Sequence, residues 1–234
     1  DEAAADAVRS LPEGFGASFE AEFVPGRDWN AEWEKNYFKP IVVGNRVVVS
    51  STFHTDVPEA EIPIFINPKM AFGTGHHATT VLMMQSLLDG GCPGASVVDM
   101  GTGTGILAIL ARKLGAASAL AVEIDAFAVE NTAENIALNL PEPTGIELVH
   151  GDATALEGRD GSADIFLANI NRNIITADID RYAAAMRPGG RLTVSGFYVH
   201  DRSVVEEAAR KAGLEPAGVA ELDNWSSMTF VKPL

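Results

Sequence analysis

The chain has 234 residues, 47% of them hydrophobic, and carries a formal net charge of −15 from 32 acidic and 17 basic residues. This length allows a substantial core, and the acidic balance disfavours DNA and RNA while suiting a basic protein partner. A single cysteine excludes a disulfide framework and a cysteine-rich zinc site, and no apolar stretch has the ~20 residues that span a bilayer. We therefore expect a cytoplasmic, monomeric protein with no membrane or DNA partner.

The first 26 residues contain one alanine-rich stretch and one alternating stretch. Residues 2–11 are typical of a short helix, and Ser18–Val24 alternates apolar and polar side chains, which predicts a half-buried strand. These two elements are too short to hold a core alone. We expect residues 1–26 to be the remnant of a small α+β N-terminal domain.

Residues 27–66 have the character of an inter-domain segment. Residues 41–49 are β-branched on both sides of Gly44-Asn45, which predicts a hairpin, and residues 62–66 predict a further strand. The third predicted domain, residues 67–234, contains the remaining elements.

A loop rich in glycine and hydroxyl side chains opens the third domain over residues 67–80. It leads into an apolar helix predicted over 81–88, and we expect Thr79 or Thr80 to cap that helix. The adjacent pair His76-His77 has no Cys, Asp or Glu close by in the sequence, so we expect no metal site there.

Strand-like and helix-like patterns alternate from residue 96 onward, which predicts a doubly wound parallel sheet. The predicted strands span 97–100, 119–124, 146–149, 164–168 and 191–197, and the predicted helices span 105–114, 126–139, 172–186 and 201–212. Two last strands, 217–222 and 227–231, are joined by so short a connection that they must pair antiparallel at the sheet edge. A mostly parallel seven-stranded α/β sheet with an antiparallel final hairpin is typical of Rossmann-like class I methyltransferases.

The first of these strands carries the most informative motif. Val97–Met100 runs directly into glycines at alternate positions, Gly101, Gly103 and Gly105, and an apolar helix follows. Glycine at such a turn permits positive φ and lets a ligand approach the backbone closely. Ile106 stands where a dinucleotide fingerprint needs its third glycine, which argues against a nicotinamide cofactor.

Polar side chains follow the next strands at the edge where ligands of open α/β sheets bind. Glu123 lies 22 positions after Gly101, where a carboxylate would accept both hydrogen bonds of a ribose diol. Asp152 follows the third strand and is placed to accept from an adenine amino group, and Asn169 follows the fourth, where a methyl acceptor should arrive. Together they predict an S-adenosylmethionine site.

Three segments resemble the ribosomal protein methyltransferases that modify large-subunit ribosomal protein eleven. They are Arg27–Pro40, the loop Met70–Thr80 and Ala168-Asn169-Ile170, and the resemblance runs from about residue 27 to the end. The loop is similar to the family signature A-F-G-T-G-T-H-P-T-T, with His76 and Ala78 in place of Thr and Pro.

The resemblance implies a Rossmann-like catalytic domain that uses S-adenosylmethionine and releases S-adenosylhomocysteine. Its substrate would be that basic ribosomal protein, methylated on lysine ε-amines and on an α-amine. By resemblance, the positions that bind the cofactor are Thr80, Gly101, Glu123 and Asn169, with Phe72 and Thr74 in a loop folding over it; the strand-end pattern adds Gly103 and Asp152.

Asn169 is the predicted catalytic residue. We expect its side-chain carbonyl to orient the amine, with or without Asn171, while Phe72–Gly75 closes the pocket. Asn171 is also suited to cap the following helix. His77 is a further candidate for removing a proton from the amine.

Three alternatives stay open at this point. One is an S-adenosylmethionine-dependent methyltransferase of another protein or of RNA, although Asn169-Ile170-Asn171 lacks the Asn-Pro-Pro pattern common in such enzymes. The second is a nicotinamide-dependent dehydrogenase. The third is a cofactor-binding fragment that lacks substrate recognition.

Overall fold

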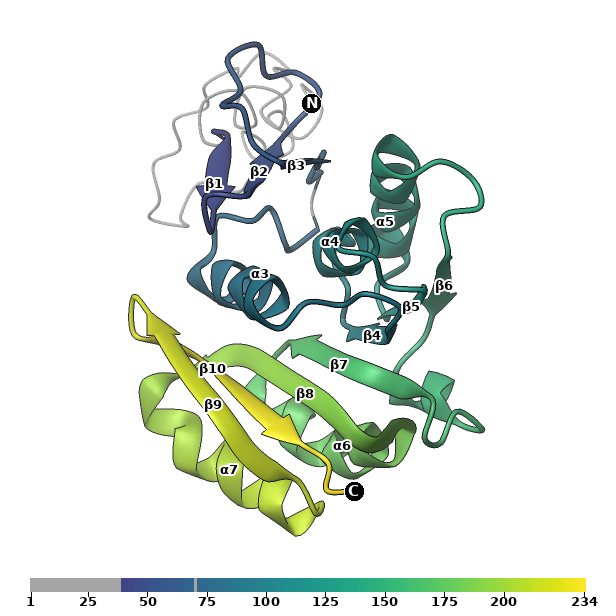
Figure 1. Ribbon diagram of the computed structural model, residues 1–234, viewed down its shortest axis with the longest axis vertical. Helices are drawn as coiled ribbons and strands as arrows, with labels where there is room; N and C mark the ends of the chain where they lie inside the picture. Colours follow the sequence, from purple (N-terminus) through teal and green to yellow (C-terminus); the bar gives the residue numbers. More distant parts are fainter. Residues whose placement is uncertain (1–38, 70) are drawn as a thin grey trace, which may run out of the picture.

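The computed structural model describes residues 39–69 and 71–234, which form a three-stranded sheet and a seven-stranded sheet (Figure 1). The predicted helix 2–11 and strand 18–24 lie outside the described residues. Within the described part, no helix combines the length and the apolar character needed to cross a bilayer.

The small sheet contains the predicted hairpin. Strands β1 (Ile41–Val43) and β2 (Val47–Ser50) pair antiparallel around a turn in which Gly44 and Asn45 both have positive φ, and β3 (Ile62–Phe65) pairs parallel with β2. Three residues, 44–46, separate the paired Val43 and Val47, and the N–H of Arg46 donates to the carbonyl of Val43 at 3.2 Å, so Gly44 and Asn45 are the two central residues of a tight turn. Positive φ at both of them matches the twist of the strands. The hairpin predicted over residues 41–49 is therefore confirmed.

The large sheet has the predicted α/β class and the predicted strand directions. Its strands are β4 (Ser96–Met100), β5 (Ser118–Glu123), β6 (Ile146–His150), β7 (Ala163–Asn169), β8 (Met186–Tyr198), β9 (Glu215–Leu222) and β10 (Trp225–Val231). They lie in the order β6-β5-β4-β7-β8-β10-β9, with β4 to β8 parallel and β10 antiparallel to both of its neighbours. The order reverses beside β4, so the carboxyl ends of β4 and β7 border the crevice where such sheets bind ligands.

Helices cover both faces of the large sheet (Figure 1). They are α3 (Ala78–Gly90), α4 (Ile106–Lys113), α5 (Ala126–Asn139), α6 (Arg172–Ala185) and α7 (Arg202–Lys211), with 3-10 turns η1 (Ala153–Leu156) and η2 (Val199–Asp201). One core joins α3, α4 and α5 to the small sheet and one face of the large sheet, and the second core joins α6 and α7 to the other face.

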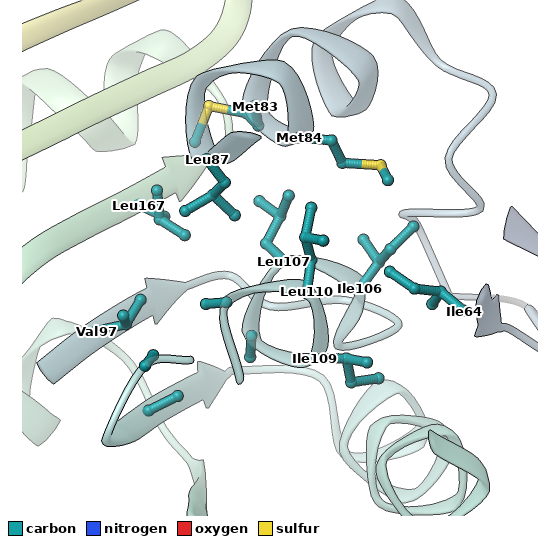
Figure 2. Packing of buried hydrophobic residues seen from close by; sticks show 14 of the residues in the cluster. Ile64, Met83, Met84, Leu87, Val97, Ile106, Leu107, Ile109, Leu110 and Leu167 are labelled. Carbon is teal, nitrogen blue, oxygen red and sulfur yellow. The ribbon is translucent and has the colours of Figure 1, made fainter. Parts of the chain in front are cut away.

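Successive side chains of each central strand point in turn into the two cores. In β4, Val97 belongs to the first core and Val98 to the second, as expected for a strand covered on both sides. Figure 2 shows Leu87 of α3, Leu110 of α4 and Leu167 of β7 among the side chains of the first core. All three leucines are fully buried, and truncating a leucine in such a place costs about 2–5 kcal/mol.

Two predicted boundaries are wrong. Helix α3 begins at Ala78 rather than at residue 81, and its cap is His77, not Thr79 or Thr80. Imidazole Nδ1 of His77 accepts from the backbone N–H of Thr79, so the first turn forms three residues earlier than the hydroxyl pattern indicated. The strand predicted over 191–197 begins at Met186 instead, because β8 continues through a bulge where its register against β7 shifts between Ala163 and Ile165.

Candidate functional site

A cavity of about 1040 Å³ opens at the carboxyl ends of the parallel strands. Its walls come from the glycine loop after β4, the end of β5 and start of α5, the end of β7 and start of α6, and single residues of β8 and β10. The loop before α3, residues 71–77, completes them, and we call it the signature loop. The predicted site residues Phe72, Gly101, Gly103, Glu123 and Asn169 all line this cavity.

The glycine loop is shaped to receive the signature loop. Gly103 has φ +58°, and a Cβ there would lie 2.3 Å from the carbonyl oxygen of Phe72. The next residue, Thr104, donates its backbone N–H to that oxygen at 2.9 Å and its Oγ1–H to the carbonyl of Gly73 at 2.6 Å. The glycine at 103 is therefore required by the contact between these two loops.

Glu123 at the end of β5 is held by backbone N–H groups. Its Oε2 accepts from Gly103 at 2.9 Å, and its Oε1 accepts from Ile124 at 2.9 Å and Asp125 at 3.0 Å. A carboxylate offers about four acceptor sites, so these three bonds leave room for about one more. The carboxylate thus fixes the glycine loop to β5 and can accept from a ligand hydroxyl in this geometry.

Asparagines on one face of α5 anchor the chain that leads into the signature loop. The side chain of Asn139 accepts from the N–H of Phe65 at 2.9 Å and donates to its carbonyl at 2.6 Å. Asn135 accepts from the N–H of Asn67 at 3.0 Å, and Asn131 donates to its carbonyl at 2.7 Å. Because these asparagines are four residues apart, they form one row along the helix and extend the pairing of β3.

Asn169 lines the cavity and carries an unpaired acceptor atom. Its Nδ2 lies 3.4 Å from Oγ1 of Thr80, whereas its Oδ1 is buried and has no hydrogen-bond partner in the part of the chain that the structure describes. A buried carbonyl oxygen without a donor is costly, so this atom is suited to receive an N–H from a bound molecule. Asn171 also lines the cavity, but its side chain caps α6 by accepting from the N–H of Asn173 at 2.9 Å.

Three predicted site residues are not part of the cavity lining. Thr80 is fully buried behind Asn169, and Oγ1 of Thr74 accepts from the backbone N–H of His76 at 3.4 Å. Asp152 is exposed and caps η1, where hydrogen bonds from Thr154 Oγ1 and N hold the pKa of its carboxyl below the ordinary value. Their roles toward a cofactor stay predictions.

The imidazole ring of His77 is held by hydrogen bonds to Thr79. Its Nδ1 accepts from the backbone N–H of Thr79 at 3.3 Å, so this nitrogen carries no hydrogen and the ring hydrogen lies on Nε2. The hydroxyl of Thr79 therefore donates to the same Nδ1 at 2.8 Å. This tautomer has no free lone pair, so the geometry gives His77 no support as a base. Within the described residues, no three His, Cys, Asp or Glu side chains gather to hold a metal ion.

Asp99 is buried under the glycine loop. Its Oδ2 accepts from Oγ1 of Thr102 at 2.6 Å and from the N–H of Ala108 at 3.2 Å, while Oδ1 has no partner among the described residues. Burial raises the pKa of this carboxyl to about 6, because its effect is larger than the lowering of the pKa by the two hydrogen bonds. The carboxyl ties the loop to the start of α4.

Several lining residues were missed by reasoning from the sequence. They include Thr79, which lies one position before the predicted Thr80, and Trp225, the first residue of β10. Both follow from local geometry: the early start of α3 turns Thr79 to the cavity, and the two-residue turn Asp223-Asn224 puts Trp225 opposite Tyr198. An Asp-Asn pair between strand-like runs is a signal for such a turn.

The sequence and the structure both match one protein family. The family described as ribosomal protein L11 methyltransferase (PrmA) matches residues 4–233. A ribosomal protein L11 methyltransferase from Bacteroides fragilis is 51% identical over 205 residues, which cover 88% of this chain and 72% of that protein. One from Symbiobacterium thermophilum is 41% identical over 231 residues, which cover 97% of this chain and 73% of that protein.

Solved structures share the fold. The ribosomal protein L11 methylase from Lactobacillus delbrueckii subsp. bulgaricus superposes with a TM-score of 0.74 at 27% identity, covering 83% of this chain and 99% of that one. A 1,6-didemethyltoxoflavin-N1-methyltransferase from Burkholderia thailandensis, solved with S-adenosylhomocysteine, shares the fold with a TM-score of 0.57 at 19% identity, covering 68% and 80% of the two chains. The predicted resemblance is confirmed, and this chain belongs to the ribosomal protein L11 methyltransferase family.

Proposed function

We propose that this enzyme transfers methyl groups from S-adenosylmethionine to amines of ribosomal protein L11, on lysine side chains and on an α-amine. The observation that carries the proposal is the unpaired Oδ1 of Asn169 beside the cavity, in a chain of this family. A buried acceptor at the end of β7 is what an incoming N–H donor requires. We accordingly expect the reaction in the cytoplasm.

The cavity suits the proposed cofactor in size and in chemistry. Its volume of about 1040 Å³ lies at the upper end of small-molecule pockets, which span roughly 300–1,000 Å³. Apolar side chains of Ile124, Phe127 and Ile174 line it beside the Glu123 carboxylate. In this proposal Glu123 accepts from a ribose hydroxyl, the apolar side chains flank the adenine, and the glycine loop faces the amino-acid part.

The proposed reaction needs a neutral amine held in line with the methyl donor. When bound, S-adenosylmethionine supplies a sulfonium methyl group: the amine lone pair forms the N–C bond, and the S–C electron pair remains on sulfur. Oδ1 of Asn169 accepts one amine N–H and so fixes the direction of the lone pair. Such orientation is the main contribution that a protein makes to a bimolecular displacement.

Proton loss from the amine precedes the transfer. A free lysine ammonium has a pKa of about 10.4, and an apolar surrounding lowers that value because it disfavours the charged form. The described residues beside Asn169 in the lining, among them Ile170 and Gly196, carry no charge. The ammonium can therefore release its proton to water without a dedicated base.

Mass spectrometry of purified L11 after incubation with this enzyme and S-adenosylmethionine tests the proposal. We expect mass gains in steps of one methyl group, located by peptide mapping to lysines or to the N-terminal amine. Calorimetry with S-adenosylhomocysteine is the parallel measurement. Cofactor binding without any methylation of L11 would contradict the proposed substrate, and failure to bind the cofactor would contradict the proposed reaction.

A further inference from the structure

The side chain of Asn135, on α5, contacts two segments that are far apart in the sequence. It is fully buried, and its Oδ1 accepts at 3.0 Å from the backbone N–H of Asn67, on the chain that enters the signature loop. Its Nδ2 donates at 3.0 Å to the backbone carbonyl of Thr104, in the glycine loop (residues 101–105), and at 3.3 Å to Oδ1 of Asn131. One amide therefore joins the glycine loop to the entry of the signature loop.

Thr104 uses all of its polar groups in contacts with other segments. Its backbone N–H donates to the carbonyl of Phe72, and its hydroxyl donates to the carbonyl of Gly73. Its own carbonyl accepts from Asn135. The signature loop thus holds one side of Thr104, and α5 holds the other.

The neighbouring Gly103 is held in the same way. Its N–H donates to Oε2 of Glu123 at 2.9 Å, and its carbonyl accepts from Oγ1 of Thr132. Thr132 precedes Asn135 by three positions, so both side chains lie on the same face of α5. The position of the glycine loop relative to the Glu123 carboxylate therefore depends on two donors from this helix.

Asn139 lies one turn further along the same face and has a different set of contacts. Its side chain accepts from the N–H of Phe65 and donates to the carbonyl of Phe65, in β3, and to the carbonyl of Asn135 in its own helix. Among the described contacts it makes no hydrogen bond to the glycine loop or to the signature loop. Of these two asparagines, only Asn135 joins α5 to the glycine loop.

Loss of the Asn135 amide would leave the N–H of Asn67 and the carbonyl of Thr104 without these partners. Thr104 is fully buried, and a buried polar group without a partner is costly. The glycine loop would therefore move toward other partners, and the Gly103 N–H that contacts Glu123 would move with it.

We propose that Asn135 is a positioning residue of the cofactor site, which holds the glycine loop and the entry of the signature loop in the arrangement that the cofactor binds. This inference rests on the proposed binding of S-adenosylmethionine for its functional consequence, whereas the arrangement of the loops belongs to the chain alone. A site that is arranged in advance costs less to bind. Loss of Asn135 should therefore lower affinity for the cofactor more than turnover at saturating cofactor.

Amide hydrogen exchange of the full chain without cofactor tests the arrangement of the loops. The readout is the amide of Thr104, which donates to Phe72 and not to Asn135, and the reference is the buried Val194 in the middle of β8. In Asn135→Ala, we expect the protection of Thr104 to fall about tenfold more than that of Val194. In the matched control Asn139→Ala, the protection of both amides should fall by the same factor, because that variant lowers only the stability of the whole fold.

Calorimetry with S-adenosylhomocysteine measures the consequence for the site. Asn135→Ala should raise the Kd about tenfold, equivalent to about 1.4 kcal/mol, while kcat at saturating S-adenosylmethionine falls by less than about threefold. Asn139→Ala should leave the Kd within about twofold of that of the unmodified enzyme. Thr132→Val is the second variant and tests the same helix face if Asn135→Ala does not fold. It removes the donor to Gly103 with little change in side-chain volume and should raise the Kd about threefold.

Two results would overturn the inference. They are an equal loss of protection at Thr104 and Val194 in Asn135→Ala, and a Kd for Asn135→Ala no weaker than that for Asn139→Ala. Selective loss of protection at Thr104 in a chain that does not bind S-adenosylhomocysteine would uphold the positioning of the loops and refute the proposed cofactor. Equally tight binding of S-adenosylhomocysteine by both variants would support the cofactor and refute the positioning.

Discussion

The backbone carbonyl of Phe72 accepts a hydrogen bond from the backbone N–H of Thr104 at 2.9 Å. This bond joins the signature loop to the glycine loop, 32 residues further along the chain. Gly103 lies against the same carbonyl, so a side chain at position 103 cannot be added without moving one of the loops. Two motifs that are separate in the sequence therefore form one wall of the cavity.

Gly103→Ala should destabilise the fold and weaken cofactor binding together. The new Cβ would lie 2.3 Å from the Phe72 oxygen, in addition to the strain of φ +58°. Gly158→Ala is the matched control, because Gly158 has φ +75° and open space where its Cβ would lie. Urea unfolding should show about 1–2 kcal/mol lost in the control and clearly more in Gly103→Ala. Equal losses would mean that the loop contact is unimportant.

Asn169→Ala should reduce turnover at least a hundredfold while changing stability by less than about 1 kcal/mol. The stability cost is small because Nδ2 makes one long contact with Thr80 and Oδ1 has no partner among the described residues. Asn171→Ala should show the contrasting pattern: its free energy of unfolding should fall by about 1 kcal/mol because the helix cap is lost, and its turnover should fall far less than that of Asn169→Ala. Single-turnover rates and unfolding curves of the two variants give the comparison. Near-normal turnover in Asn169→Ala would refute the proposed role.

Glu123→Gln should weaken binding of S-adenosylhomocysteine by tenfold or more. An amide keeps one acceptor oxygen, so the bonds from Gly103 on one side and from Ile124 and Asp125 on the other cannot all persist. Glu130→Gln removes a charge from the same cavity lining and has no such backbone bonds among the described contacts. Calorimetry should therefore show a larger loss of S-adenosylhomocysteine affinity in Glu123→Gln than in Glu130→Gln. Similar small losses of affinity in both variants would mean that Glu123 contributes only its negative charge.

Local patterns were enough to predict most of the fold. The strand, glycine loop and helix from Val97 onward, the parallel alternation and the final antiparallel pair depend on nearby residues and on short connections, and the structure confirms them. The insertion of β10 between β8 and β9 depends on pairing with β8, about 30 residues away, which no local pattern indicates.

Site residues that directly follow a strand were predictable from the sequence. Those whose position depends on a cap or turn elsewhere were not. Glu123 and Asn169 come directly after buried strands, and both line the cavity. Thr79 and Trp225 take their positions from the His77 cap and from the two-residue turn before β10. Histidine is an uncommon cap residue, so hydroxyl side chains were the natural expectation for that position.

The stability that Asp99 contributes should rise as the pH falls. Burial raises the pKa of this carboxyl to about 6 from an ordinary 3.8, so the folded state binds the proton more tightly than the unfolded state. The favourable contribution is complete below about pH 3.8 and is lost as the pH rises through about 6. Between pH 7 and pH 4 the protein should therefore gain about 2 kcal/mol relative to Asp99→Asn.

Urea unfolding of both proteins at several pH values measures this difference. The variant serves as the reference because the other carboxylates titrate in both proteins, and their contribution cancels. Asn at position 99 retains one acceptor oxygen for Thr102 and Ala108, so the variant should remain folded. A stability difference that is constant from pH 7 to pH 4 would show that Asp99 titrates alike in both states. A difference that grows toward low pH identifies the carboxyl beneath the glycine loop as protonated in the folded enzyme.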